Sequence, residues 1–119
     1  MARMTRKRAE RLTGYEIRPI ADPGNEVRFG AFEGGELVAD AGGAVDWLAL
    51  EELVARVYQI HARRALERSG WRCARCRRSG RLHIHHRRYR SHGGTHEVEN
   101  LEAVCWKCHR LIHQVERSE

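Results

Sequence analysis

The sequence predicts an α+β fold, because segments of strand character precede a long helical pattern. The three strand segments are YEIRPI (15–20), EVRFGAF (26–32) and ELVADA (36–41). Turn-forming residues separate them at DPGN (22–25) and EGG (33–35), as in an antiparallel meander. The second half of the chain differs, since it concentrates cysteine and histidine. We therefore expect a small meander and a helix, followed by a compact unit held by metal.

A helix is predicted to start at residue 46, directly after a Gly-Gly break. Asp46 can cap its start, and Ser69-Gly70 is a typical helix end. The apolar side chains that recur at helical spacing are Trp47, Leu50, Val54, Val57 and Tyr58. This stripe predicts core packing, and His61 on the same helix is expected to be an ordinary core or surface histidine.

Charge is distributed unevenly along the 119 residues, whose formal net charge is +6. Residues 1–13 contain five basic and one acidic side chain, residues 14–60 three and nine, and residues 61–119 fourteen and six. The corresponding net charges are +4, −6 and +8, so a polyanion would be attracted to the two ends of the chain. Arginine supplies most of this charge, which either genome composition or phosphate binding explains. The basic N-terminal arm, which either follows a nucleic-acid backbone or lacks order, comprises Arg3, Arg6, Lys7, Arg8 and Arg11.

Two C-x-x-C pairs, Cys73 with Cys76 and Cys105 with Cys108, contain all four cysteines. The basic N terminus lacks the apolar stretch of a signal peptide, and no apolar run approaches a membrane span. We therefore expect a cytoplasmic protein without a membrane partner, in which thiolates bind metal rather than form disulfides. Four thiolates suit a tetrahedral structural Zn²⁺, and the 28 residues between the pairs leave room for a hairpin.

The remaining histidines form a second candidate set, because a zinc ion with four thiolates needs no imidazole. His85 and His86 are adjacent at the end of a predicted strand (82–86), where neighbouring side chains point to opposite faces. His109 and His113 lie four residues apart, on one face of a predicted final helix. These histidines are either surface residues or the ligands and base of a second centre.

The combined pattern resembles the HNH endonucleases, which have the ββα-metal (His-Me finger) fold. It reads C-x-x-C, L-x-I-H-H, a Gly-Gly loop, E-N-L and V-C-x-x-C-H-x-x-x-H, and it covers residues 60–115. The resemblance implies an α+β fold in which a ββα-metal core with a structural zinc on four cysteines follows the meander and helix. We accordingly expect two parts, residues 1–45, an arm and meander of unknown role that the resemblance does not cover, and residues 46–119, a helix plus the nuclease core.

By this resemblance, His86 is the general base and His85 and His109 hold one catalytic divalent metal, Mg²⁺, Mn²⁺, Ni²⁺ or Zn²⁺. Asn100 shapes the loop and orients the base. His113 is either a third ligand or a phosphate contact. A neutral imidazole can take a proton from water near neutral pH, and a bound metal can polarise the scissile phosphate. The resemblance therefore implies a metal-dependent endonuclease that leaves a 3′-hydroxyl and a 5′-phosphate.

The substrate is expected to be double-stranded DNA, with Arg87, Arg88 and Arg90 as phosphate contacts. His83 is expected beside the ligands or on the surface, and His92 and His96 are expected to be incidental loop residues. Two alternatives remain open at this point. One is a non-catalytic, zinc-stabilised nucleic-acid-binding module, and the other is a ribonuclease or a nuclease toxin domain.

Overall fold

The first half of the chain forms a three-stranded antiparallel sheet in the order β1-β2-β3. The strands are β1 (Glu16–Ile20), β2 (Val27–Glu33) and β3 (Glu36–Gly43). They belong to a computed structural model that describes residues 2–118, with side chains described as far as residue 114. The predicted meander is therefore confirmed, with strand bounds shifted by one or two residues.

The basic N-terminal arm is a helix, α1 (Arg6–Thr13). The side chain of Thr5 caps it by accepting a hydrogen bond of 3.2 Å from the backbone N–H of Arg8. Gly14 ends it in the left-handed conformation, with φ of 77°. Ala9 and Leu12 are buried, whereas the arginine and lysine side chains of the first turn are exposed. The arm is thus ordered by capping and by one small apolar face.

The long helix α2 (Asp46–Arg68) follows the sheet. Its N-cap residue is Val45, which has no capping side-chain bond, so the prediction that Asp46 caps the helix was wrong. Asp46 lies in the first turn, where a carboxylate is stabilised by the helix dipole. The predicted end is confirmed, because Ser69 is the C-cap and Gly70 has a φ of 68°.

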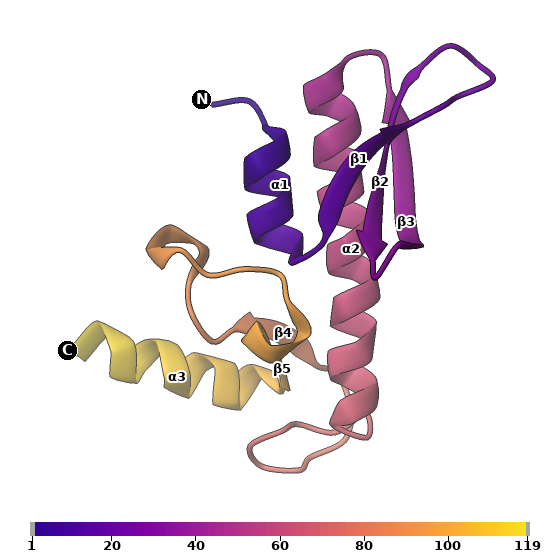
Figure 1. Ribbon diagram of the computed structural model, residues 1–119. Helices are drawn as coiled ribbons and strands as arrows, with labels where there is room; N and C mark the ends of the chain where they lie inside the picture. Colours follow the sequence, from indigo (N-terminus) through magenta and orange to yellow (C-terminus); the bar gives the residue numbers. More distant parts are fainter. Residues whose placement is uncertain (1, 119) are drawn as a thin grey trace.

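One hydrophobic core joins α1, the sheet and the N-terminal part of α2. These elements lie together in the same half of the molecule (Figure 1). It includes Leu12 of α1, Ile17 and Phe29 of the sheet, and Leu53 and Val57 of α2. This core spans the boundary that the sequence predicts between residues 45 and 46, and the division of the chain stays a prediction. Within residues 2–118, no helix combines the length and apolar character needed to cross a lipid bilayer.

The second half of the chain has the order strand, strand, helix and lies beside the C-terminal part of α2 (Figure 1). Its elements are β4 (His83–His86), the 3-10 turns η1 (Arg90–His92) and η2 (Val98–Asn100), β5 (Leu101–Val104) and α3 (Trp106–Ser118). β4 and β5 pair antiparallel. The predicted ββα core is confirmed, although the final helix starts at Trp106, since the first residues after Asn100 form β5.

Candidate metal centres and active site

The four cysteine sulfurs converge on one point, and all lie within 4.8 Å of one another. The Sγ atoms of Cys76 and Cys105 are 3.7 Å apart. Four sulfurs at ~2.3 Å from a tetrahedral zinc ion would be separated by about 3.8 Å. The donor set and its spacing therefore fit a structural zinc ion. Only a small apolar cluster surrounds the cysteines, so metal binding would supply much of the stability here.

Backbone geometry brings the two C-x-x-C pairs together. Arg77 adopts a left-handed conformation with φ of 65°, and its N–H donates to the carbonyl of Cys73 at 2.9 Å, which closes a tight turn. The N–H of Ala74 donates to the carbonyl of Ala103 in β5 at 2.8 Å, so the turn is fastened to the hairpin. Cys105 follows β5 and Cys108 lies in the first turn of α3. The second pair is thus carried by the strand-to-helix junction.

The thiols of the cluster shift one another's pKa values in opposite directions. Burial raises the pKa of Cys73, but backbone N–H donors including that of Cys76 outweigh it and lower the pKa to about 6. Burial and contacts with the other thiols raise the pKa of Cys108 to about 12. Mutual repulsion would oppose four thiolates at this spacing, and a bound cation would offset it.

A second group of ligands lies at β4 and α3, where ring nitrogens of His85, His109 and His113 are within 4.8 Å of one another. The Nε2 atoms of His109 and His113 are 3.0 Å apart. Two nitrogens at ~2.1 Å from one ion lie about 3.0–3.4 Å apart at right-angled to tetrahedral geometry, so the three imidazoles fit one divalent cation. The hydroxyl of Tyr89 lies 2.9 Å from Nδ1 of His113 and so orients that ring with Nε2 toward His109.

Burial lowers the pKa of His109, with further contributions from His113, His85 and His83. A lowered pKa keeps the imidazole neutral near pH 7, which is the form that binds metal. His83 is exposed and stacks on His109 with ring centroids 5.8 Å apart. His83 thus lies beside the ligands, as expected, and supports one of them by packing.

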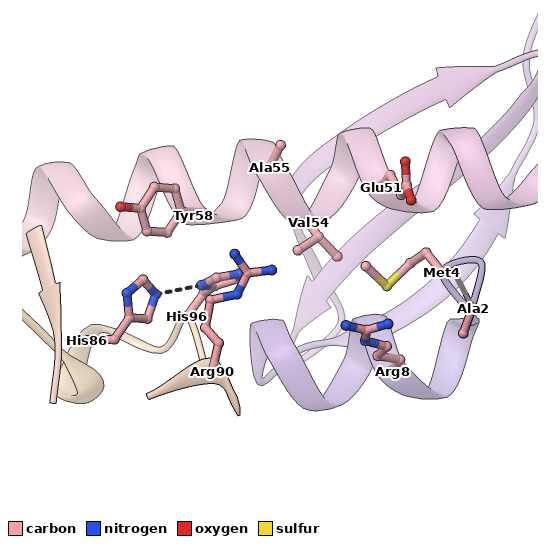
Figure 2. A pocket seen from close by; sticks show the side chains of 10 residues that line it. All are labelled: Ala2, Met4, Arg8, Glu51, Val54, Ala55, Tyr58, His86, Arg90 and His96. Atoms are coloured by element: carbon pink, nitrogen blue, oxygen red, sulfur yellow. Dashed lines mark hydrogen bonds between the residues drawn. The ribbon is translucent and has the colours of Figure 1, made fainter. Parts of the chain in front are cut away.

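His86 contacts a different set of residues from its neighbour His85. Its ring stacks on Tyr58 of α2 with centroids 5.7 Å apart, and its Nε2 atom lies 3.0 Å from Nδ1 of His96. The other ring nitrogen of His86 points away from His96 (Figure 2). Burial lowers the pKa of His86, and the charges of Arg90 and His85 add to this effect. His86 is therefore held neutral near pH 7, with one nitrogen engaged by a hydrogen bond.

His96 is not incidental, in contrast to the prediction. It is 6% exposed, and burial together with His86, Arg90 and His61 lowers its pKa to about 4. Its backbone is fixed from two sides, because its N–H donates to the carbonyl of Leu12 at 2.8 Å and its carbonyl lies 2.8 Å from Nδ1 of His61. Nothing in the local pattern around His96 predicts this contact, since His61 and Leu12 lie far away in the sequence.

Asn100 holds the loop between β4 and β5 in shape. Its Oδ1 accepts a hydrogen bond of 2.8 Å from the N–H of Arg88, and its Nδ2 donates to the carbonyl of Thr95 at 2.7 Å. Gly94 is needed where the loop crosses itself, since a Cβ atom there would overlap the carbonyl oxygen of Arg88. The loop that carries His96 is therefore fixed by one side chain and one close backbone contact.

The three arginines expected at phosphates differ in their surroundings. Arg87 pairs with the buried carboxylate of Glu102 at 3.1 Å, and Nε of Arg88 donates to the carbonyl of His92 at 2.6 Å. Arg90 is exposed and lines two neighbouring hollows. Arg90 is thus the arginine of this set that lies beside both His86 and the histidine cluster.

The histidine cluster opens into a hollow of about 300 Å³. Its walls include His85, His109 and His113 together with His86, so the candidate base borders the same space as the candidate ligands. A larger groove of about 530 Å³ adjoins it between α1, α2 and the loop, and Figure 2 shows His86, His96, Arg90 and Arg8 along it. His86 and Arg90 line both hollows.

Residues 73–114 match the model of the HNH endonuclease family. The chain carries an HNH domain. This HNH domain contains both ligand clusters, His86 and Asn100, whereas α1, the meander and α2 lie outside the matched residues. Comparison with curated proteins and with solved structures gave no match. The roles of the individual HNH residues stay predictions.

Proposed function

We propose that the protein is a metal-dependent HNH endonuclease that hydrolyses phosphodiester bonds of DNA. The observation that carries the proposal is that His86 borders the hollow in which His85, His109 and His113 converge. A base beside a metal-binding cluster is an arrangement that can hydrolyse a phosphodiester, because the base activates water and a metal offsets charge on the phosphate. The HNH match and the basic charge of the C-terminal segment support a nucleic acid as the substrate.

In this proposal His85 and His109 hold the catalytic metal, and His113 completes the set. A divalent cation bound there would polarise the scissile phosphate and offset the negative charge that builds on the leaving oxygen. Three imidazoles favour Ni²⁺ or Zn²⁺ over Mg²⁺, which prefers oxygen ligands. Mn²⁺ and Mg²⁺ remain ions to test. The four-cysteine cluster holds a separate, structural zinc ion.

His86 is the general base of the proposed reaction. If its Nε2 carries the ring proton and donates to Nδ1 of His96, then Nδ1 of His86 is left free to accept a proton from water. The water oxygen bonds to phosphorus, and the bond from phosphorus to the 3′ oxygen breaks. The 3′ oxygen leaves with the electron pair and takes a proton from solvent. The products are a 3′-hydroxyl and a 5′-phosphate.

Asn100 and the arginines complete the proposed site. Asn100 keeps the loop that carries His96 in place and so positions the base indirectly. Arg90 contacts a phosphate beside the scissile bond, and Arg87 and Arg88 add positive field at the edge of the site. Duplex DNA in the cytoplasm is the proposed substrate, and ribonuclease activity is the alternative within the same chemistry.

Cleavage of supercoiled plasmid tests the proposal. Purified protein is incubated with plasmid and Mg²⁺, Mn²⁺, Ni²⁺ or Zn²⁺, and His86→Ala and His92→Ala are compared with the wild type. We expect nicked or linear products from the wild type and from His92→Ala, whose imidazole does not contact His86. His86→Ala should lose about 10²–10⁴-fold in rate while it still binds DNA.

The rival function is a nucleic-acid-binding module without catalysis. It uses the same zinc cluster and the same basic surface, but it does not require His86 beside the cluster of His85, His109 and His113. Binding of DNA without cleavage in any of the four metals would support this rival. A parallel incubation with single-stranded RNA separates the ribonuclease alternative, since RNA would then be cut and plasmid would not.

A further inference from the structure

We infer that the groove between α1, α2 and the loop binds the nucleotides that flank the scissile phosphate on the cut strand, with Arg8 as a phosphate contact. This inference rests on the proposed function and adds to it a substrate path outside the HNH domain. Arg8 belongs to α1, which no part of the HNH match covers. The N-terminal helix would therefore be part of the substrate site.

Continuity with the histidine hollow is the first reason. His86 and Arg90 line both the 300 Å³ hollow and the 530 Å³ groove, so a strand whose phosphate reaches the metal ligands would continue into the groove. Figure 2 shows the order of the side chains along it, from His86 past Arg90 to Arg8. The two arginines thus line the same groove and can each contact a phosphate of one strand.

The second reason for the inference is that α1, which forms one wall of the groove, is fixed relative to the loop between β4 and β5. The carbonyl of Leu12 accepts the hydrogen bond from the N–H of His96 at 2.8 Å. The guanidinium of Arg3 lies over the ring of Trp47 in α2, 5.0 Å from its centroid. This contact ties the segment before α1 to α2, and Ala9 and Leu12 of α1 pack in one core with α2. α1 is therefore held to both the loop and α2, which fixes the backbone that carries Arg8.

Charge and surface chemistry fit a nucleotide strand. The N-terminal segment has a net charge of +4, and Arg8 and Arg90 are both exposed. Met4, Val54 and Ala55 give the groove an apolar surface, which suits the faces of bases and sugars between charged phosphates. Glu51 also lines the groove, at the end away from His86 (Figure 2). The charge of Arg90 therefore attracts an anion toward the end of the groove at which the neutral His86 lies, and Glu51 weakens the attraction at the other end.

The size of the groove sets how much of the substrate enters it. A volume of about 530 Å³ lies within the range of ~300–1,000 Å³ that holds small-molecule ligands. The groove therefore accommodates about one or two nucleotides of a single strand. The rest of the substrate would lie outside, against the basic surface of the HNH domain.

Binding of a short fluorescent oligonucleotide tests the inference, with Arg8→Ala compared with Arg6→Ala. Both variants lose one arginine from the first turn of α1, but Arg6 does not line the groove. Both changes replace an exposed residue by a good helix former, so α1 should remain folded. We expect Arg8→Ala to weaken binding by about tenfold. The slope of log K against log salt concentration should fall in magnitude by about one, because one phosphate contact is lost. Arg6→Ala should change the dissociation constant by less than about twofold.

A second pair of variants tests the opposite wall. Ala55→Glu puts one negative charge into the groove, and Gln59→Glu puts the same charge on an exposed position of α2 outside it. We expect only Ala55→Glu to weaken binding by several-fold. Equal effects within each pair would overturn the inference and leave only a general attraction by charge. No effect in either pair would also overturn it, because the groove would then not contribute to binding.

Cleavage assays on the same variants separate this inference from the proposed function. If the wild type cuts plasmid and Arg8→Ala behaves as Arg6→Ala does in binding and cleavage, the nuclease stands and the groove is not used. If Arg8→Ala and Ala55→Glu weaken binding but the wild type cuts nothing in any metal, the groove is a binding site and the nuclease proposal fails.

Discussion

Replacement of His96 tests whether this buried residue positions the proposed base. His96→Ala removes the atom that lies 3.0 Å from Nε2 of His86, and His96→Asn keeps an acceptor there, because Asn Oδ1 can take the place of Nδ1. His92→Ala is the matched control, since His92 lies in the same loop and is exposed. Comparison of His96→Ala with His96→Asn thus separates the effect of the hydrogen bond from the effect of losing the imidazole ring, and His92→Ala reports the effect of losing a histidine elsewhere in the loop.

The expected effect of His96→Ala can be bounded from the structure. Loss of one hydrogen bond of ~0.5–1.5 kcal/mol reduces kcat by about 2–10-fold when the ring stays in place. Complete loss of base function would reduce it by about 10²–10⁴-fold. Stacking on Tyr58, with an interplanar angle of 7°, still holds the ring of His86, so we expect about tenfold.

Steady-state cleavage kinetics and thermal unfolding should be measured together for these variants. We expect His96→Ala to lower kcat with little change in KM, and His96→Asn to restore most of the loss. The cavity left by alanine should cost about 2 kcal/mol, less than the stability of a typical domain. Equal kcat values for the alanine and asparagine variants would show that His96 acts only by filling space.

Three further perturbations have defined outcomes. Cys76→Ser should remove one zinc equivalent from the protein, measured by mass spectrometry. It should also unfold the C-terminal half, because such zinc sites contribute ~10–16 kcal/mol. A circular dichroism spectrum equal to that of the wild type would refute the structural role. Gly94→Ala should abolish cleavage while the structural zinc stays bound, because the new Cβ would overlap the carbonyl of Arg88; cleavage equal to that of His92→Ala would show that the loop tolerates a shift. The free energy of unfolding, measured with urea, should fall as the pH falls from about 6.5 to about 4, since unfolded His96 takes up a proton in this range and folded His96 does not. The part of this decrease due to His96 should reach at most about 3 kcal/mol. If His96→Asn showed the same decrease as the wild type, the pH dependence would not come from His96.

Local patterns were enough to predict the meander, α2 and the two clusters of candidate ligands, but not the helix α1. Turn residues delimited the meander, apolar spacing located α2, and the two C-x-x-C pairs indicated a structural zinc site. The histidine spacing placed His85 and His86 on a strand and His109 and His113 on one helix face. These inferences succeed because side-chain period and ligand spacing are properties of short segments of chain.

Errors arose where a residue's environment depends on distant segments. Asp46 has the side chain of a helix cap, but the chain enters α2 so that Val45 takes that position. The residues directly after Asn100 form β5 because they pair with β4, which their own spacing does not predict. Propensity is a weak preference, and a partner strand overrides it.

The sequence by itself determined which side chains are candidates for metal binding, because the type and spacing of cysteine and histidine are properties of short segments. Only the tertiary structure decided what surrounds the proposed base. It brought Tyr58 and His96 to His86 and placed α1, with Arg8, along the adjoining groove. Arg8, Tyr58 and His86 belong to three segments that lie far apart in the sequence. No local period encodes their proximity. It follows from the way in which α1 and the loop between β4 and β5 pack against α2.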